Sequence, residues 1–148
     1  MLIRKLKYGD ITAVSDIMID LWGKEIAIHA ANEMDEMFFS NSLWPPQYFV
    51  AEIDGNVVGF AGFKKMWLMS NSYEIIWNNV KKEYQGQKIG KMLMLKIIEN
   101  VKSLGGTLIF SMTKNPIPGL KRGFRKVDEF NGYFLMALEL GPTEISAK

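Results

Sequence analysis

Residues 81–106, KKEYQGQKIGKMLMLKIIENVKSLGG, connect a predicted strand to a predicted helix through a short basic loop. The loop, 85–91, contains two glycines, and Gly105-Gly106 ends the helical pattern that follows. The apolar residues at helical spacing are Ile89, Met92, Leu93, Ile97, Val101 and Leu104. Because the first N–H groups of a helix have no internal partner and the helix dipole is positive there, the loop is suited to hold a phosphate or pyrophosphate. An ordinary strand-to-helix connection would have the same outline.

Two nucleotide-binding motifs are disfavoured at this loop. A P-loop needs G-x-x-x-x-G-K-[ST], but Gly86 to Gly90 is one residue too short and Met92 stands where the hydroxyl residue belongs. A Rossmann fingerprint needs three glycines in a longer chain of repeated βα units, and the sequence has neither. A nucleotide triphosphatase and a dinucleotide dehydrogenase are therefore poor interpretations.

The stretch 73–98, YEIIWNNVKKEYQGQKIGKMLMLKII, resembles the central motif of the GNAT superfamily of acetyl-CoA-dependent N-acetyltransferases. That motif is a strand, then [QR]-x-x-G-x-[GA], then a helix. Gln85 and Gly90 fit it, Gly86 lies inside it, and Lys88 stands where the middle glycine would be. The resemblance implies that backbone amides of the loop hold the pyrophosphate of acetyl-CoA (coenzyme A). The cofactor-binding residues it implies are Asn79, Val80, Gln85, Gly86, Gln87, Lys88, Ile89, Gly90, Lys91 and Asn115.

Length and composition narrow the class of protein. The 148 residues, 48% of them hydrophobic, predict one domain with a substantial core. The sequence has no cysteine and one histidine, His29, so disulfides, a thiol nucleophile and a multi-histidine metal site are excluded, and no metal is expected. The N-terminus is too polar for a signal peptide, and no apolar run approaches the roughly 20 residues that cross a bilayer. We therefore expect a cytoplasmic protein without a membrane partner.

The net charge of +2 conceals two regions of opposite sign. Residues 81–91 carry four lysines against Glu83, and residues 114–126 carry five basic residues and no acid. Residues 10–54 carry nine acids against Lys24 alone. A basic region suits a polyanionic cofactor, and an acidic region could attract a cationic amine, although the acidic region could equally be solvated surface.

Hydrophobic periodicity and turn residues predict the elements along the chain. A helix is expected to begin after Asp10 as its N-cap, and Asn131-Gly132 predicts a type I′ hairpin turn. The predicted segments are strand 2–6, helices 11–22 and 26–39, strands 48–53, 57–63 and 73–80, the central helix, strand 107–112, a short basic helix after 115–119, and strands 124–130 and 133–140. The tail 141–148 is expected to be frayed.

This order also resembles the GNAT fold over about residues 1–140, which would form a single GNAT-like domain. The fold class implied is α/β (α+β), with a mixed, mostly antiparallel sheet of about seven strands, splayed in the middle, and about four helices. In that family the pantetheine arm lies where the strand before the loop and the strand after the central helix separate, here 73–80 and 107–112. By this resemblance, backbone groups of Asn79 and Val80 pair with the pantetheine amides and Asn115 binds the same arm. Otherwise, Asn115 is a turn residue before Pro116.

The chemistry that the resemblance implies is attack of an amine on a thioester, which requires a base and stabilisation of an oxyanion. Glu74, on the strand before the loop, is the candidate catalytic base; alternatively it faces solvent or forms a structural ion pair. Gly119 stands where many members of the family carry a tyrosine as general acid. Tyr133 and Tyr84 are weak substitutes, and a thiolate of fairly low pKa could also leave unprotonated.

The acceptor is not defined by the sequence. The acidic residues Glu25, Glu33, Asp35 and Glu36 and the aromatic residues Trp22, Trp44, Trp67, Trp77, Phe38 and Phe39 would suit a small cationic amine or a protein amine. Two other interpretations stay open: a non-catalytic acyl-CoA-binding sensor or interaction module, and a nucleic-acid-binding protein that uses 114–126, which the absence of interleaved aromatic residues disfavours. An edge strand in the last hairpin would permit a homodimer.

Overall fold

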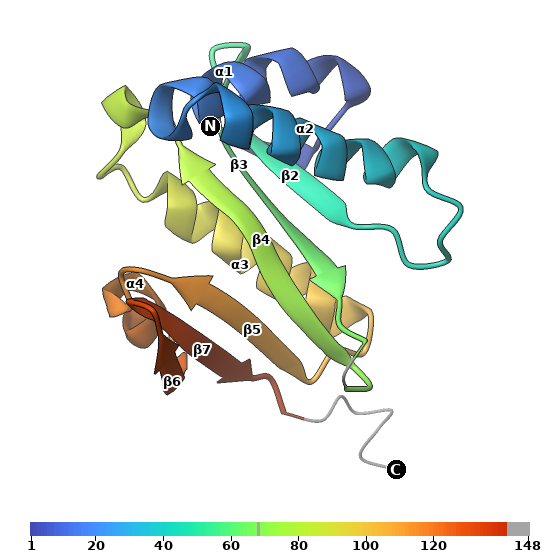
Figure 1. Ribbon diagram of the computed structural model, residues 1–148, viewed down its shortest axis with the longest axis vertical. Helices are drawn as coiled ribbons and strands as arrows, with labels where there is room; N and C mark the ends of the chain where they lie inside the picture. The colour runs from blue at the N-terminus through green and yellow to red at the C-terminus, as the bar shows by residue number, and fades with distance from the viewer. Residues whose placement is uncertain (68, 142–148) are drawn as a thin grey trace. The chain divides into compact units, whose positions relative to one another are not determined.

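The computed structural model describes residues 1–67 and 69–141 (Figure 1). Within these ranges the chain forms seven strands, four α-helices and two 3-10 turns. In chain order they are β1 (Leu2–Lys5), η1 (Tyr8–Asp10), α1 (Ile11–Trp22), α2 (Lys24–Phe39), β2 (Gln47–Ile53), β3 (Asn56–Lys65), β4 (Ser72–Val80), η2 (Lys82–Tyr84), α3 (Ile89–Ser103), β5 (Leu108–Thr113), α4 (Ile117–Lys121), β6 (Arg125–Phe130) and β7 (Tyr133–Glu139). None of the helices described is long and apolar enough to cross a membrane.

The strands form one sheet in the order β1-β2-β3-β4-β5-β7-β6. The β1–β2, β2–β3, β5–β7 and β6–β7 pairs are antiparallel, whereas β4 and β5 run parallel. The parallel ladder joins Ser72 to Leu108 at one end and Glu74 to Phe110 at the other. The predicted mixed, mostly antiparallel sheet of seven strands with four helices is therefore confirmed.

Turn residues explain where the elements end. Gly23 has φ +91°, a left-handed conformation that separates α1 from α2, and α2 begins at Lys24, two residues before the predicted start. Asn131 and Gly132 have φ +51° and +81°, as the predicted type I′ turn requires. The predicted face of α3 was wrong in part, because Met92 and Leu104 are 41% and 55% exposed. The predicted frayed tail lies outside the described residues except for Gly141.

The chain divides into two compact units whose segments alternate along the sequence. The first contains Met1–Lys64 and Ile76–Ile97, and the second contains Lys65–Ile75 and Ile98–Lys148. Strand β4 and helix α3 each begin in one unit and end in the other. Each unit therefore consists of two segments that are separated in the sequence by a segment of the other unit.

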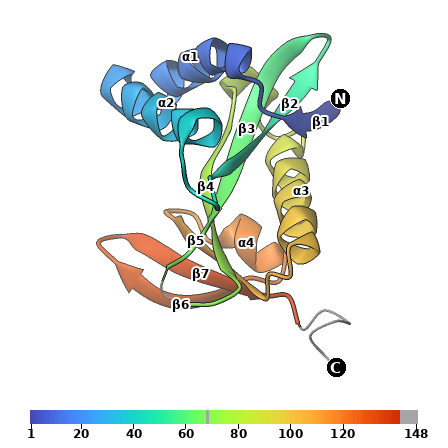
Figure 2. The same ribbon diagram turned by 90° about the vertical axis from the view of Figure 1, so that its right-hand side faces the viewer.

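The first unit is a sheet of strands covered on both faces. Helices α1 and α2 cover one face and the first part of α3 covers the other, as Figure 2 shows from the side. Because successive side chains on a strand point to opposite faces, Tyr48 and Val50 pack with the α1–α2 core while Phe49 faces α3. On that second face the rings of Phe49 and Phe63 stack at 6.5 Å, and Lys96 of α3 lies over Phe49.

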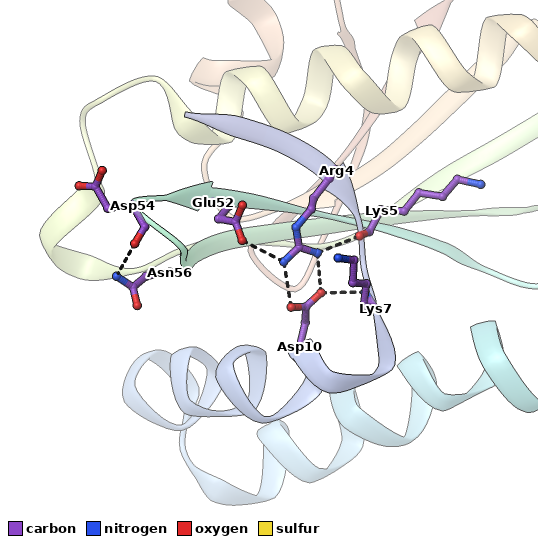
Figure 3. Close-up of polar contacts among 7 residues, drawn as sticks. All are labelled: Arg4, Lys5, Lys7, Asp10, Glu52, Asp54 and Asn56. Atoms are coloured by element: carbon purple, nitrogen blue, oxygen red, sulfur yellow. Dashed lines mark hydrogen bonds and ion pairs between the residues drawn. The ribbon is translucent and has the colours of Figure 1, made fainter.

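An ion-pair cluster secures the N-terminal edge of this unit (Figure 3). Arg4 on β1 donates two hydrogen bonds to the Asp10 carboxylate, at 2.7 and 3.0 Å, and one to Glu52 on β2 at 3.3 Å. The Asp10 carboxylate also accepts the Lys7 backbone N–H at 2.7 Å. Asp10 stands at the predicted N-cap position of α1, but its side chain makes no capping bond to the helix because it points back to Arg4 and Lys7.

The second unit is built on the β5–β7–β6 part of the sheet. The β6–β7 hairpin and the short helix α4 lie beside β5 in Figure 1. Its interior contains buried side chains from β4, α3, β5 and β7, and Phe124 beside the end of α4. These side chains are Tyr73, Val101, Ile109, Phe124, Met136 and Ala137.

Candidate active site

The loop between β4 and α3 has an unusual backbone. After the turn η2, Gly86 has φ +83° and Lys88 has φ +66°. The left-handed conformation favours glycine, so Lys88 adopts the geometry that the middle glycine of the motif would provide without strain. The first bond of α3 runs from the Met92 N–H to the Lys88 carbonyl at 3.1 Å. The N–H groups of the residues just before Met92 therefore have no partner inside the helix.

The first turn of α3 lies close to β3 and β4. A Cβ placed on Gly59 would lie 3.2 Å from the Asn79 carbonyl oxygen and 3.3 Å from Ile89 Cγ2. Pairing with β3 continues beyond the end of β4, where the Lys81 N–H donates to the Val58 carbonyl at 2.8 Å. Glycine at 59 thus permits the close approach that sets the start of α3 against the strands.

Side chains at both ends of this segment hold it in place. Gln85 Nε2 donates to the Val80 carbonyl at 2.9 Å, which folds the loop back on the last residue of β4. Trp22 Nε1, at the end of α1, donates to Asn79 Oδ1 at 2.8 Å. The structure therefore brings together Asn79, Val80 and the loop 85–91, whose role in cofactor binding stays a prediction. It adds Trp22, whose contact the sequence did not indicate.

The loop is open to solvent and positively charged. Gln85, Gly86, Gln87, Lys88 and Lys91 are all exposed, whereas Ile89 is buried beneath them. Unpartnered N–H groups, a helix N-terminus and lysines form the donor set that a pyrophosphate requires, so the residues present fit that group.

A cavity of about 700 Å³ lies beside the loop, between α1 and the start of β3. Asp16, Asp20 and Glu83 line it together with Lys81, which is 3.5 Å from Glu83. Three carboxylates and one lysine disfavour an anion. The phosphates are therefore expected at the exposed N–H groups and not in this cavity.

Glu74 lies in the second unit, on the part of β4 that pairs with β5. Its side chain is half-buried, and it stands opposite Phe110 in the parallel ladder. The role of Glu74 as the base stays a prediction.

Asn115 also lies in the second unit, between β5 and α4. Its Oδ1 accepts the Ile117 N–H at 3.2 Å, and its backbone N–H donates to Thr113 Oγ1 at 3.1 Å. Asn115 therefore serves as a turn residue before α4, as one of the two sequence interpretations predicted, and its Nδ2 is not used in that turn. Tyr133 is 41% exposed, with Lys114 Nζ 5.1 Å from its ring centroid.

Tyr48 is a buried polar residue that the sequence did not single out. Its ring lies over its register partner on β3, Gly62, where a Cβ would stand 2.5 Å from Tyr48 Cδ1. Its hydroxyl is buried and has no hydrogen-bond partner. Sequence alone cannot reveal such a pair, because it depends on the register between β2 and β3.

Among residues 1–67 and 69–141, no group of three acidic, histidine or cysteine side chains could hold a metal.

Comparison with known proteins identifies one family. The family model described as "Acetyltransferase (GNAT) family" matches residues 13–116, well over half of the chain. No curated protein sequence matches significantly.

One similar solved structure is the PaiA N-acetyltransferase from Thermoplasma acidophilum in complex with coenzyme A, which is 21% identical with a TM-score of 0.74, over 93% of this chain and 98% of that one. The aminoglycoside 6′-N-acetyltransferase from Enterococcus faecium is 19% identical with a TM-score of 0.79, over 97% and 99%. An acetyltransferase of the GNAT family from Staphylococcus aureus Mu50 is 17% identical with a TM-score of 0.73, over 95% and 99%. At these identities the structures show a shared fold.

Proposed function

The chain belongs to the acetyltransferase (GNAT) family, whose members use acetyl-CoA, and we propose that it transfers the acetyl group to an amine by direct attack in a ternary complex. The observation that carries this proposal is the loop before α3, where two left-handed residues and a helix N-terminus leave backbone N–H groups unpaired. We keep the cytoplasm as its expected location.

Each part of the loop has a proposed task in binding. The N–H groups of 86–91 donate to the pyrophosphate, and the lysines add positive charge. Gln85 keeps the loop folded against Val80, and Trp22 fixes the Asn79 side chain. Backbone groups of Asn79 and Val80 are then available to the pantetheine amides, and Asn115 offers Nδ2 to the same arm.

Acetyl-CoA supplies an activated acetyl group, so that a C–N bond forms as the C–S bond breaks and the thiolate departs. In this proposal Glu74 accepts the proton that the attacking amine loses, directly or through a water molecule. We assign no general acid, because Gly119 stands at the tyrosine position of the family. A thiolate of fairly low pKa can leave without a protein proton and take one from solvent.

The first experiment is the melting temperature of the purified protein with acetyl-CoA, ATP or NAD at equal concentration. A ligand at ~100 times its Kd stabilises the folded state by about 2.7 kcal/mol, which raises the midpoint by several degrees in a chain of this size. A rise with acetyl-CoA alone is expected. No rise, or an equal rise with ATP, would contradict the assignment of the loop.

The second candidate is a protein that binds acyl-CoA without turnover, which the glycine at 119 favours. The two candidates differ in one observable, since only an enzyme releases free CoA thiol when an amine is added. A panel of small di- and polyamines, an aminoglycoside and a lysine-containing peptide, assayed for thiol release, distinguishes them.

A further inference from the structure

Strand β6 forms one edge of the sheet (Figure 2). In the strand order it follows β7, and among residues 1–67 and 69–141 no strand lies on its outer side. All six of its residues are exposed, including the apolar Val127 and Phe130 at 44% and 49%. An edge strand presents unpaired backbone N–H and C=O groups, so it can act as a template for another strand.

The charges on β6 are separated along the strand. Its sequence, RKVDEF over 125–130, begins with two cations and continues, after one apolar residue, with two acids. Charges of one sign at an edge repel a second copy of the same strand. A block of cations followed by a block of acids attracts a second copy when the two strands run antiparallel.

One antiparallel register between two copies pairs every charge of β6 with an opposite charge. In this register Val127 lies on the two-fold axis, opposite the same residue of the second copy. Arg125 then lies opposite Glu129 of the second copy. Lys126 likewise lies opposite Asp128 of the second copy. Directly opposite residues of an antiparallel pair share a face of the sheet, so these opposite charges attract.

Other registers are less favourable. Shifting the antiparallel pairing by one residue in either direction leaves one kind of opposite-charge pair in place of two. Parallel pairing places each charge beside the same charge of the second copy. The charge pattern therefore favours one register and makes β6 complementary to itself, as a two-fold interface requires.

A β-bulge lies at the centre of this register. Lys126 pairs with Met136 and Asp128 pairs with Leu135, so Val127 between them has no register partner on β7. A bulge twists an edge strand and shortens the stretch that can pair. The interface is therefore expected to be short and weak, and the charge pairs on either side of Val127 decide its register.

Ion pairs within the chain leave these charges available. Lys126 Nζ lies 3.2 Å from Glu129 Oε2 and 4.9 Å from the Phe134 ring centroid, and an Arg125 guanidinium nitrogen lies 3.5 Å from Glu139 Oε1. Both side chains of the Lys126–Glu129 pair are 48% exposed. Because exposed ion pairs contribute little to stability, pairs with a second copy can extend or replace them with little loss.

The other edge strand, β1, lacks this pattern. It has four residues, and its charged residues Arg4 and Lys5 are both basic. Arg4 already donates hydrogen bonds to Asp10 and Glu52. A strand with cations and no acid is not complementary to itself in charge.

We propose that two copies of this chain pair antiparallel through β6, with Val127 on the two-fold axis, and form a homodimer whose register is set by the charge pairs. The sheet then continues from one copy into the other. The interface uses only residues of the second unit and does not depend on acetyl transfer.

The test is sedimentation velocity of the full chain from about 1 µM to about 1 mM at low ionic strength. The sedimentation coefficient should rise with concentration from the value of a monomer toward that of a dimer. Because the charge pairs are exposed, the dissociation constant should increase about tenfold between about 0.05 and about 0.5 M salt. A monomer at every concentration would overturn the proposal and leave the edge to a strand of a different protein.

Charge reversal identifies the surface and the register. Lys126→Glu sets two acids opposite each other across the interface, and Asp128→Lys sets two lysines opposite each other. Each variant alone should dimerise about tenfold or more weakly than wild type. An equimolar mixture of the two should recover association, because each reversed charge then meets an opposite charge. A mixture that associates as weakly as the separate variants would refute the register.

Two controls separate pairing from net charge and from folding. Lys102→Glu reverses an exposed lysine of α3 in the same unit and should leave association unchanged. Equal weakening by Lys102→Glu and Lys126→Glu would show a general effect of charge and refute the paired interface. Lys126→Gln removes the charge without reversing it and should give an intermediate dissociation constant at an unchanged melting temperature. Association of Lys126→Gln and Lys126→Glu equal to that of wild type would place the interface elsewhere.

Discussion

The indole Nε1 of Trp22 donates a hydrogen bond to Asn79 Oδ1 at 2.8 Å, which ties the last residue of α1 to β4 just before the loop 85–91. Helix α1 thereby helps to position the strand whose backbone is proposed to bind pantetheine.

Trp22→Phe is expected to remove this bond with little change in packing. Because Trp22 is 56% exposed, the loss of stability should be only about 0.5–1 kcal/mol, and acetyl-CoA should bind about twofold to fivefold more weakly. Calorimetric titration of acetyl-CoA and thermal melting measure both effects. Trp67→Phe, at a side chain that is 99% exposed, is the matched control and should change neither.

Lys88→Gly is expected to keep or raise stability, by up to about 1 kcal/mol, because glycine adopts φ +66° without the steric cost that lysine bears. Lys91→Gly makes the same substitution inside α3 and should lower stability by about 1 kcal/mol. Chemical denaturation of the two variants tests the contrast. A similar loss in both would show that position 88 is not left-handed in solution.

Gly62→Ala should destabilise the first unit by about 1–3 kcal/mol through overpacking. The new Cβ would stand 2.5 Å from Tyr48 Cδ1 and 2.9 Å from the Gln47 carbonyl oxygen, and the latter is backbone that cannot simply rotate away. Gly9→Ala, where no atom lies within 4 Å, is the control. Comparable melting temperatures for the two variants would contradict the placement of the Tyr48 ring.

The Arg4–Asp10 pair predicts a pH dependence of stability. The hydrogen bonds from the Arg4 guanidinium hold the pKa of Asp10 below its usual range, although partial burial opposes them. A lowered folded-state pKa means that the unfolded chain binds protons first on acidification, so this stabilisation is present at neutral pH and is lost as the pH falls through about 4 and below.

Asp10→Asn should therefore lower the free energy of unfolding by about 1–3 kcal/mol at pH 7, and the difference from wild type should shrink near pH 3. Urea titrations at several pH values measure this. Asp54→Asn is the control, because aspartate and asparagine both tolerate the positive φ at position 54. The free energy of unfolding of this variant should stay within about 0.5 kcal/mol of wild type. A gap for Asp10→Asn that is constant with pH would refute the ion-pair explanation.

Glu74→Gln should lower kcat by roughly 10²-fold or more if Glu74 is the base, while the melting-temperature shift with acetyl-CoA is retained. Glu139→Gln, on an exposed glutamate of β7, is the control and should leave kcat unchanged. An unchanged rate in Glu74→Gln would exclude Glu74 as the base.

Local signals in the sequence predicted most of the fold. Asn131-Gly132 predicted the last hairpin, because only residues that tolerate positive φ fit a type I′ turn. The two glycines of 85–91 and the apolar spacing after them located the loop and α3. The prediction that Met92 and Leu104 share the buried face of α3 was wrong. Apolar residues at the margin of a helical stripe can be buried or exposed, according to which elements lie beside them.

The parts of the site that depend on contacts between distant segments could not be predicted. Gly62 allows the Tyr48 ring to lie over it only because the β2–β3 register places them opposite each other. The positive φ of Trp77 could not be predicted either, because the residue is neither glycine nor asparagine. Its conformation is enforced by the packing around it. Asp10 looked like a helix cap because the sequence does not show that Arg4 competes for its carboxylate.

The alternation of the two units along the chain bears on how the protein folds during synthesis. Translation produces Met1–Lys64 first, but that unit also needs Ile76–Ile97, and the intervening Lys65–Ile75 belongs to its neighbour. A nascent chain that has emerged only to residue 75 therefore lacks the second part of β4 and the start of α3. Because of this alternation, no single proteolytic cut yields two fragments that each contain one complete unit. About two thirds of the chain must be synthesised before the core of the first unit can form.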